Sequence, residues 1–454
     1  MLRSINPFDN ALVREYPELS PTEILEITKL SYEAFNEWSQ TSFAYRAEKM
    51  KHAAEVLRKQ KEELSRLMTI EMGKPIVQSR SEIEKCAWVC EYYADNAETF
   101  LSDEIVKTDA AKSFIAYRPL GPVLAVMPWN FPFWQVFRFA APGLMAGNTG
   151  ILKHASNVTG CALAIEKIFN HAGFPSNVFR TITASSKYIA PVIADQNVKA
   201  VTLTGSVPAG KAVSSAAGAS LKKTVLELGG SDAYLILEDA DLKTAADICV
   251  ISRLINGGQS CIAAKRFIIV ESVYNKFEEL FVDVMQSKKM GDPFDEQNHL
   301  GPQASIPLRN ELHQQVLQSV EKGASILTGG FVPDSKGAFY PPTVLSNVKK
   351  NMPAYDDELF GPVASLIKVK DESEGIMVAN DTSFGLGAAV FTADTERGEK
   401  IARDKLHAGC CFVNDFVKSD PRLPFGGIKE SGYGRELSVF GIREFVNIKS
   451  VYVK

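Results

Sequence analysis

A chain of 454 residues is longer than a single hydrophobic core supports, so two or three domains are expected. Its hydrophobic content of 45% and charged content of 23% are typical of a globular protein and exclude extensive disorder. The net charge of -4 argues against nucleic acid or a membrane as a partner, and without a bilayer-length apolar run or a signal-like start a cytoplasmic protein is expected.

Helical patterns dominate the first hundred residues. Apolar positions such as Ala47, Met50, Ala54 and Leu57 recur at steps of three or four, which predicts amphipathic helices over residues 21–100. A strand is predicted at 113–118, and short apolar runs then alternate with helical patterns. These runs lie at 123–127, 149–153, 178–182 and 200–204. Strands separated by helices predict a parallel, doubly wound sheet.

A second alternation of strands and helices follows residue 229. Strands are predicted at 233–237 and 267–270, with helices at 242–255 and 273–285, which indicates a second α/β domain. The tail at 445–453 alternates apolar and polar residues as a strand does. Its edge would be unpaired unless something covers it, and a neighbouring subunit is one candidate.

The seven cysteines are an odd number and widely spread, which predicts reduced thiols. Cys86 and Cys90 are four residues apart in a helical pattern, but no second Cys or His pair has zinc-site spacing, so no metal is expected. Cys261 ends the segment Gly257-Gly258-Gln259-Ser260-Cys261, where small and polar residues follow a helical pattern. An arbitrary cysteine is most often a small core residue, but this setting predicts an accessible, pKa-lowered nucleophile.

Two other segments place polar side chains in apolar or rigid surroundings. Glu227 lies in the apolar run Leu226-Glu227-Leu228-Gly229-Gly230, where burial would raise its pKa toward that of a general base. The alternative is a glutamate that pairs with a nearby cation. Asn130 lies between two prolines in Pro128-Trp129-Asn130-Phe131-Pro132, and a rigid amide there can stabilise an oxyanion.

A phosphate site is indicated by Thr204-Gly205-Ser206, which follows a predicted strand and opens a predicted helix. Amides at a helix N-terminus bind anions, and glycine permits a close approach. The next glycine, Gly210, does not complete the usual dinucleotide fingerprint, so this segment alone is a weak signal.

Taken together, these segments resemble the NAD(P)-dependent aldehyde dehydrogenase superfamily over nearly the whole chain. In chain order they are Pro128 to Pro132, Thr204-Gly205-Ser206, Glu227 to Gly230, Gly258 to Cys261, Glu358-Leu359-Phe360-Gly361-Pro362 and Pro424-Phe425-Gly426-Gly427. Six motifs in this order are specific, although any one of them would not be.

The resemblance implies a role for each matching residue. Cys261 would be the nucleophile, Asn130 the oxyanion donor and Glu227 the base that activates water, which favours water over coenzyme A or phosphate as the acyl acceptor. The residues implied in NAD or NADP binding are Trp129, Lys153, Ser156, Gly205, Ser206, Glu358 and Phe360.

The resemblance also implies three structural parts. Residues 1–100 and 120–229 would form a Rossmann-like NAD(P)-binding domain, and residues 230–435 an α/β catalytic domain. Residues 101–119 and 436–454 would form a small β oligomerisation element of a homodimer or homotetramer.

Within the family, the chain is similar to bacterial succinate-semialdehyde dehydrogenases. Arg138 follows Asn130 by about two helical turns, so its guanidinium can bind a distal carboxylate in the substrate tunnel. The alternative is an arginine paired with a structural carboxylate at a domain boundary. Other residues that resemble the tunnel lining are Trp134, Ser419 and Phe425.

The cofactor expectation depends on Ser156. Many family members that prefer NAD have a glutamate three residues after the position of Lys153, and this chain has Ser156 there. Without that carboxylate a 2'-phosphate is not repelled, so NADP should be accepted besides NAD.

Two alternatives stay open. The first is an aldehyde dehydrogenase for another small polar or acidic aldehyde, such as glutarate semialdehyde, lactaldehyde or glyceraldehyde 3-phosphate. A protein of the same fold with a structural role, like the lens crystallins related to this family, is disfavoured by the intact Cys261, Glu227 and Asn130.

Overall fold

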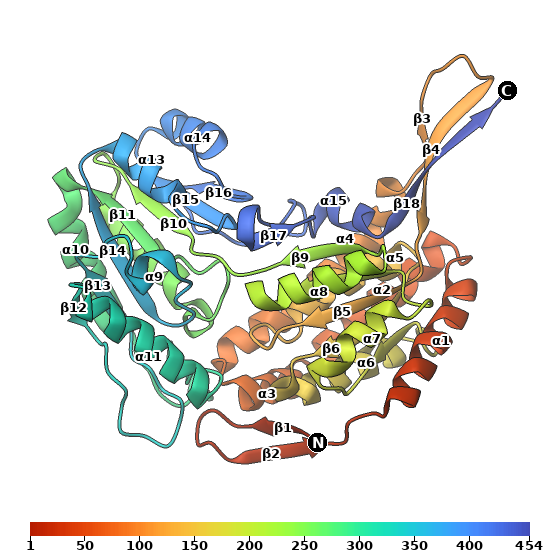
Figure 1. Ribbon diagram of the computed structural model, residues 1–454, viewed down its shortest axis with the longest axis horizontal. Helices are drawn as coiled ribbons and strands as arrows, with labels where there is room; N and C mark the ends of the chain where they lie inside the picture. Colours follow the sequence, from red (N-terminus) through yellow and green to blue (C-terminus); the bar gives the residue numbers. More distant parts are fainter.

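Two α/β bodies lie side by side in the computed structural model, which describes residues 1–454, and a narrow β arm projects from one of them (Figure 1). The strands form sheets of six, seven, three and two strands. No helix of the chain is both long and apolar enough to cross a membrane.

The six-stranded sheet has the order β17-β9-β8-β5-β6-β7. β5 is central, the chain adds β6 and β7 on one side and β8 and β9 on the other, and these strands are all parallel. The strands are β5 (Pro122–Met127), β6 (Thr149–His154), β7 (Phe179–Thr181), β8 (Ala200–Thr204), β9 (Lys223–Glu227) and β17 (Gly432–Tyr433). The strand order reverses between β5 and β8, which is where open parallel sheets bind ligands.

Helices cover both faces of this sheet because its central strand is apolar on both sides. Val123 and Ala125 of β5 pack into one hydrophobic cluster, and Leu124 and Val126 pack into another. The helices are α1 (Pro21–Trp38), α2 (Phe43–Lys59), α3 (Lys61–Met72), α4 (Ile76–Phe100), α5 (Trp134–Met145), α6 (Thr159–His171), α7 (Ile189–Ala194) and α8 (Val207–Ala219). The predicted helices over 21–100 and the predicted doubly wound sheet are confirmed.

A buried carboxylate fixes the start of α5. Glu82 of α4 accepts hydrogen bonds from the amides of Phe133 (2.9 Å) and Trp134 (3.0 Å), and its other oxygen pairs with buried Lys74. The first amides of a helix lack partners within the helix, so an acceptor here stabilises this end. The contact therefore ties the segment after Asn130 to α4.

The seven-stranded sheet has the order β12-β13-β14-β11-β10-β15-β16, and only β12 runs antiparallel to its neighbour. Its strands are β10 (Ala233–Ile236), β11 (Arg266–Val270), β12 (Ser325–Thr328), β13 (Thr343–Ser346), β14 (Val363–Val369), β15 (Gly387–Phe391) and β16 (Cys410–Val413). Its helices are α9 (Leu242–Leu254), α10 (Glu271–Gln286), α11 (Ile306–Glu321), α12 (Pro353–Asp356), α13 (Glu372–Asn380) and α14 (Thr395–Asp404). The predicted second α/β alternation is confirmed.

Two small sheets complete the fold. β18 (Val446–Val453), β4 (Lys112–Pro119) and β3 (Glu104–Ile105) form the projecting arm, and β1 (Leu2–Ile5) pairs with β2 (Leu12–Tyr16). β18 pairs with β4 on one side only, so its other edge is open. α15 (Ser438–Glu444) packs on α4 and α5. β17 lies within the predicted catalytic domain, residues 230–435, but pairs with β9 of the six-stranded sheet, so the chain returns to the first body before residue 435.

Candidate active site

A tight turn after α9 positions Cys261. Asn256, Gly257 and Gly258 all have positive φ, at 54°, 63° and 76°. A Cβ added to Gly258 would lie 2.3 Å from the carbonyl carbon of Gly361, so this position requires glycine. The turn directs Cys261 away from the helix and toward the six-stranded sheet.

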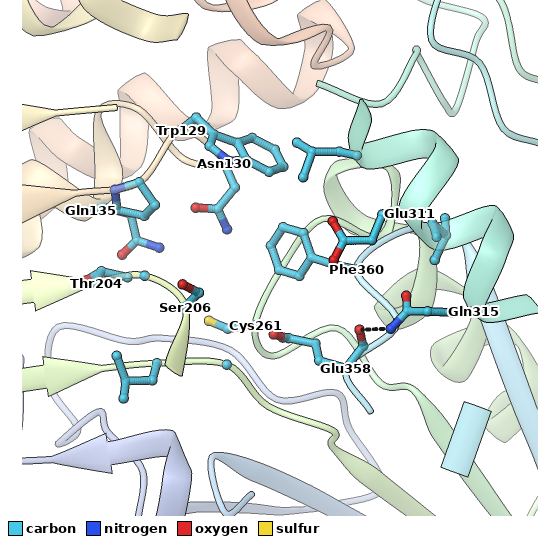
Figure 2. A pocket seen from close by; sticks show the side chains of 16 residues that line it. Trp129, Asn130, Gln135, Thr204, Ser206, Cys261, Glu311, Gln315, Glu358 and Phe360 are labelled. Carbon is cyan, nitrogen blue, oxygen red and sulfur yellow. Dashed lines mark hydrogen bonds between the residues drawn. The ribbon is translucent and has the colours of Figure 1, made fainter. Parts of the chain in front are cut away.

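Cys261 lies where two cavities meet, and Gln135 also lines both. The first, called the β5/β8 cavity, has about 270 Å³ and lies at the carboxyl ends of these strands. Figure 2 shows Thr204 and Ser206 on one side of it, Glu358 and Phe360 on the other, and Cys261 between them. The second, called the α4/α5 cavity, has about 300 Å³ and takes residues from α4, α5 and the loop 416–425.

The environment of Cys261 raises the pKa of its thiol to about 12, and burial is the main cause. The charges of Arg138 and Lys265 act in the opposite direction but do not outweigh burial. The prediction of a lowered pKa from flanking small and polar residues is therefore wrong for the protein alone, because the fold encloses this segment between its two bodies.

Asn130 is held beside Cys261 by the same turn. Its Nδ2 donates to the carbonyl of Gln259 (3.1 Å), and its own carbonyl accepts from Asn256 Nδ2 (2.7 Å). An amide nitrogen carries two hydrogens, so one remains for a ligand in the β5/β8 cavity. This arrangement suits an oxyanion donor.

Glu227 is buried at the end of β9 and lines neither cavity. Neither carboxylate oxygen has a hydrogen-bond partner, and burial raises its pKa well above the ordinary value. Arg138, Arg435 and Glu436 are its charged neighbours. The structure thus brings Glu227 near the site and leaves its carboxyl free, but does not aim it into a cavity.

Arg138 lines the α4/α5 cavity, and its guanidinium is already paired. Its Nε forms an ion pair with Glu436, and the side chains are only 2% and 5% exposed. Nη2 also lies 3.4 Å from Thr204 Oγ1, and the guanidinium stacks on Phe425 at 4.7 Å. These contacts match the alternative in which Arg138 pairs with a structural carboxylate.

The other three predicted tunnel residues, Trp134, Ser419 and Phe425, also line the α4/α5 cavity. Trp134 Nε1 donates to Ser419 Oγ at 3.1 Å. The structure therefore gathers all four residues, from α5 and from a segment far along the chain, around the Cys261 thiol.

Five of the predicted cofactor residues line the β5/β8 cavity: Trp129, Gly205, Ser206, Glu358 and Phe360. Trp129 and Phe360 meet edge to face at 5.6 Å, and Glu358 is fixed by the amide of Gly230 at 3.0 Å. Lys153 and Ser156 do not line this cavity, but lie at the end of β6 and the start of the 3-10 helix η1 (Ser156–Val158), beside β5.

The β5/β8 cavity fits a dinucleotide by the chemistry of its donors. Ser206 caps α8, and its side chain bonds no amide of the first turn, which leaves these amides for an anion. Lys153 has no carboxylate partner, and burial alone lowers its pKa. These groups would hold phosphate and ribose, and the Trp129 and Phe360 rings offer an apolar surface to a planar ring.

Comparison with known proteins identifies the family. The model of the aldehyde dehydrogenase family matches residues 1–451. The chain belongs to this family. Its fold and the resemblance of its six motifs are thereby confirmed.

Several similar family members have a named activity. A probable succinate-semialdehyde dehydrogenase [NADP(+)] of Synechocystis is 49% identical over 100% of this chain and 99% of its own length. A succinate semialdehyde dehydrogenase [NAD(P)+] of Escherichia coli is 45% identical over 99% and 97%. The crystal structure of succinic semialdehyde dehydrogenase from Streptococcus pyogenes with NADP+ has a TM-score of 0.98 at 36% identity, and covers 100% of both chains.

Several residues that line the two cavities were not predicted from the sequence. Gln135, Glu311 and Gln315 line the β5/β8 cavity, and Lys85 lines the α4/α5 cavity. Glu436 neutralises Arg138. Gln135 follows Trp134 in the same predicted helix, so its neighbourhood to the site could have been predicted. Lys85 lies in a charged, helical stretch, and nothing in that stretch indicates a binding site.

Proposed function

We propose that this aldehyde dehydrogenase oxidises succinate semialdehyde to succinate, with NADP or NAD as hydride acceptor, through a thioester on Cys261. The observation that carries the proposal is the position of Cys261 between a cavity suited to a dinucleotide and a cavity lined by basic side chains. The names of the relatives at 45% and 49% identity support it.

In the proposed reaction, the thiol of Cys261 loses its proton to water, its thiolate attacks the aldehyde carbon, and the new oxyanion accepts a hydrogen bond from Asn130 Nδ2. The bound dinucleotide supplies the acceptor for the hydride that leaves this carbon. Glu227 then takes a proton from the water that hydrolyses the thioester. Since Glu227 lines neither cavity here, its side chain must turn toward Cys261 for this step.

For the cofactor we propose acceptance of NADP besides NAD. Lys153 has no carboxylate partner, and Ser156 puts no carboxylate where a 2'-phosphate would lie. The relatives that support this are named for NADP(+) and NAD(P)+.

For the assembly we propose a homodimer or homotetramer in which the arm formed by β3, β4 and β18 contacts a second copy. The arm exposes apolar side chains, with Ile105 72%, Ile448 60% and Tyr452 57% exposed. Exposed apolar groups beside an open strand edge favour association.

A steady-state panel tests the proposed function. We expect kcat/KM for succinate semialdehyde to exceed that for butanal by at least about tenfold, since a bound carboxylate adds 1.4 kcal/mol or more. Glutarate semialdehyde, lactaldehyde and glyceraldehyde 3-phosphate serve as comparisons, each with NAD and NADP. Equal values for succinate semialdehyde and butanal would reject the proposed substrate.

A further inference from the structure

We propose that Lys85 binds the distal carboxylate of the substrate, with Ser419 as the second donor. This assignment rests on the proposed function, because it concerns the acidic end of a semialdehyde held at Cys261. It assigns substrate choice to a side chain of α4, outside the motifs by which the family is identified.

Lys85 is the one charged residue of the α4/α5 cavity without an ion-pair partner. The other three are Glu82, paired with Lys74, Arg138, paired with Glu436, and Lys418, paired with Asp415. A half-buried ammonium without a counter-ion is costly, and an anion in the cavity offsets that cost. The cavity therefore provides one uncompensated positive charge.

The acids nearest to Lys85 are already engaged. Glu82 accepts from two amides of α5 and pairs with Lys74. Asp420 pairs with Arg422 at 2.6 Å. Both acids raise the pKa of Lys85, while Arg138 and burial lower it, but neither acid forms an ion pair with Lys85. A ligand carboxylate would not have to displace a protein partner.

Ser419 orients Lys85 and has a hydrogen to donate. Lys85 Nζ donates to Ser419 Oγ at 2.8 Å, and Trp134 Nε1 donates to the same oxygen at 3.1 Å. A hydroxyl has two lone pairs and one hydrogen, so with both lone pairs engaged its remaining function is donation. Lys85 also lies 4.2 Å from the centre of the Trp134 ring, which fixes its direction.

The ammonium and the hydroxyl thus form a pair of donors suited to the two oxygens of one carboxylate. Lys85 keeps two of its three hydrogens for a ligand, and Ser419 keeps one. Arg138 lines the same cavity, but Glu436 already provides a counter-ion for its charge, so the uncompensated positive charge is that of Lys85.

The test is substrate preference in Lys85→Met, which keeps the length of the side chain and removes its charge. We expect kcat/KM for succinate semialdehyde to fall roughly 30-fold to 150-fold, and that for butanal by less than about threefold. Lys85→Arg keeps the charge and should recover at least about a tenth of the wild-type value. Lys61→Met is the matched control, since Lys61 of α3 pairs with Glu84 of α4 and lines no part of the cavity.

Inhibition by succinate separates this proposal from the proposed function. Succinate should inhibit butanal oxidation by the wild type, with an inhibition constant at least about tenfold higher in Lys85→Met. If the wild type prefers succinate semialdehyde and Lys85→Met keeps both the preference and the inhibition, Lys85 is not the ligand and the function stands. If the wild type shows no preference but Lys85-dependent inhibition, the carboxylate site stands and the substrate is wrong.

Discussion

Of the three basic residues that line the α4/α5 cavity, Arg138 and Lys85 differ most in their surroundings. Arg138 is buried between Glu436 and Glu227, while Lys85 has no ion-pair partner. Removing one member of a buried pair strands the other charge, whereas removing an unpaired cation strands none. Residue type alone would have favoured Arg138, because guanidinium is the better match for a carboxylate.

Arg138→Met should therefore destabilise the whole enzyme. We expect the free energy of unfolding to fall by about 3 to 5 kcal/mol, because Glu436 is left buried and unpaired. Urea denaturation measures this loss, and kcat/KM should fall in similar proportion for succinate semialdehyde and butanal. A selective loss on succinate semialdehyde with unchanged stability would instead make Arg138 the carboxylate ligand.

The pH dependence of substrate preference provides a second test at this scale. Burial and Arg138 lower the pKa of Lys85 to about 8, and Cys86, Glu82 and Asp420 act in the opposite direction. Lys85 is charged below this pKa, so the ratio of kcat/KM for succinate semialdehyde to that for butanal should be constant below it and fall above it. Taking the ratio cancels the titration of Cys261, which both substrates share.

Lys418 also lines this cavity, but it pairs with Asp415 and is therefore not expected to produce this titration. In Lys85→Met the ratio should be low and independent of pH. A wild-type ratio that rises between pH 7 and 9 would contradict the assigned role of Lys85.

At the scale of elements, the end of β6 and the start of α8 together offer groups to the cofactor. Lys153 and Ser156 lie at the first, and Gly205 and Ser206 at the second. Because β5 separates β6 from β8 in the sheet, a dinucleotide must span the ends of several strands. The discrimination between NAD and NADP should then depend on the β6 end alone.

Ser156→Glu tests this division. A carboxylate near Lys153 would repel a 2'-phosphate and accept bonds from a ribose, so KM for NADP should rise at least about tenfold relative to KM for NAD. Ser156→Ala is the matched control, because it removes the hydroxyl without adding charge. An unchanged ratio of the two KM values would place the 2'-phosphate elsewhere.

The predicted helices and strands match the structure where they depend on a local pattern of residues. The strand predicted at 200–204 coincides with β8, and the helix at 242–255 differs from α9 by one residue, because both depend on the periodicity of apolar residues. The motif residues around Cys261 were likewise found from the sequence, since each motif is a short segment. The pKa of Cys261 was not, because burial is a property of the folded chain.

The substrate pocket shows the limit of local patterns most clearly. Lys85 and Ser419 are 334 positions apart and meet at 2.8 Å. Lys85 lies in an amphipathic helix, where a charged residue usually faces solvent. Only the packing of α4 against α5 and the loop 416–425 turns this side chain into the cavity.

At the scale of the whole molecule, the arm of β3, β4 and β18 projects beyond both bodies (Figure 1). Ile448→Lys together with Tyr452→Lys should reduce a homodimer or homotetramer to smaller species, because lysines on an exposed strand oppose association. Light scattering after size exclusion measures the mass. A wild type that is monomeric at micromolar concentration would reject the proposed assembly.

The central claim is that the two bodies enclose a covalent reaction on Cys261, and trapping the thioester tests it most directly. Glu227→Gln removes the proposed base, so succinate semialdehyde and NADP should yield one equivalent of NADPH rapidly and then turn over slowly. Mass spectrometry of the quenched protein should find a succinyl group on Cys261 and on no other cysteine, and none in Cys261→Ala. A rapid phase without acylated Cys261, or acylation at another residue, would contradict the account.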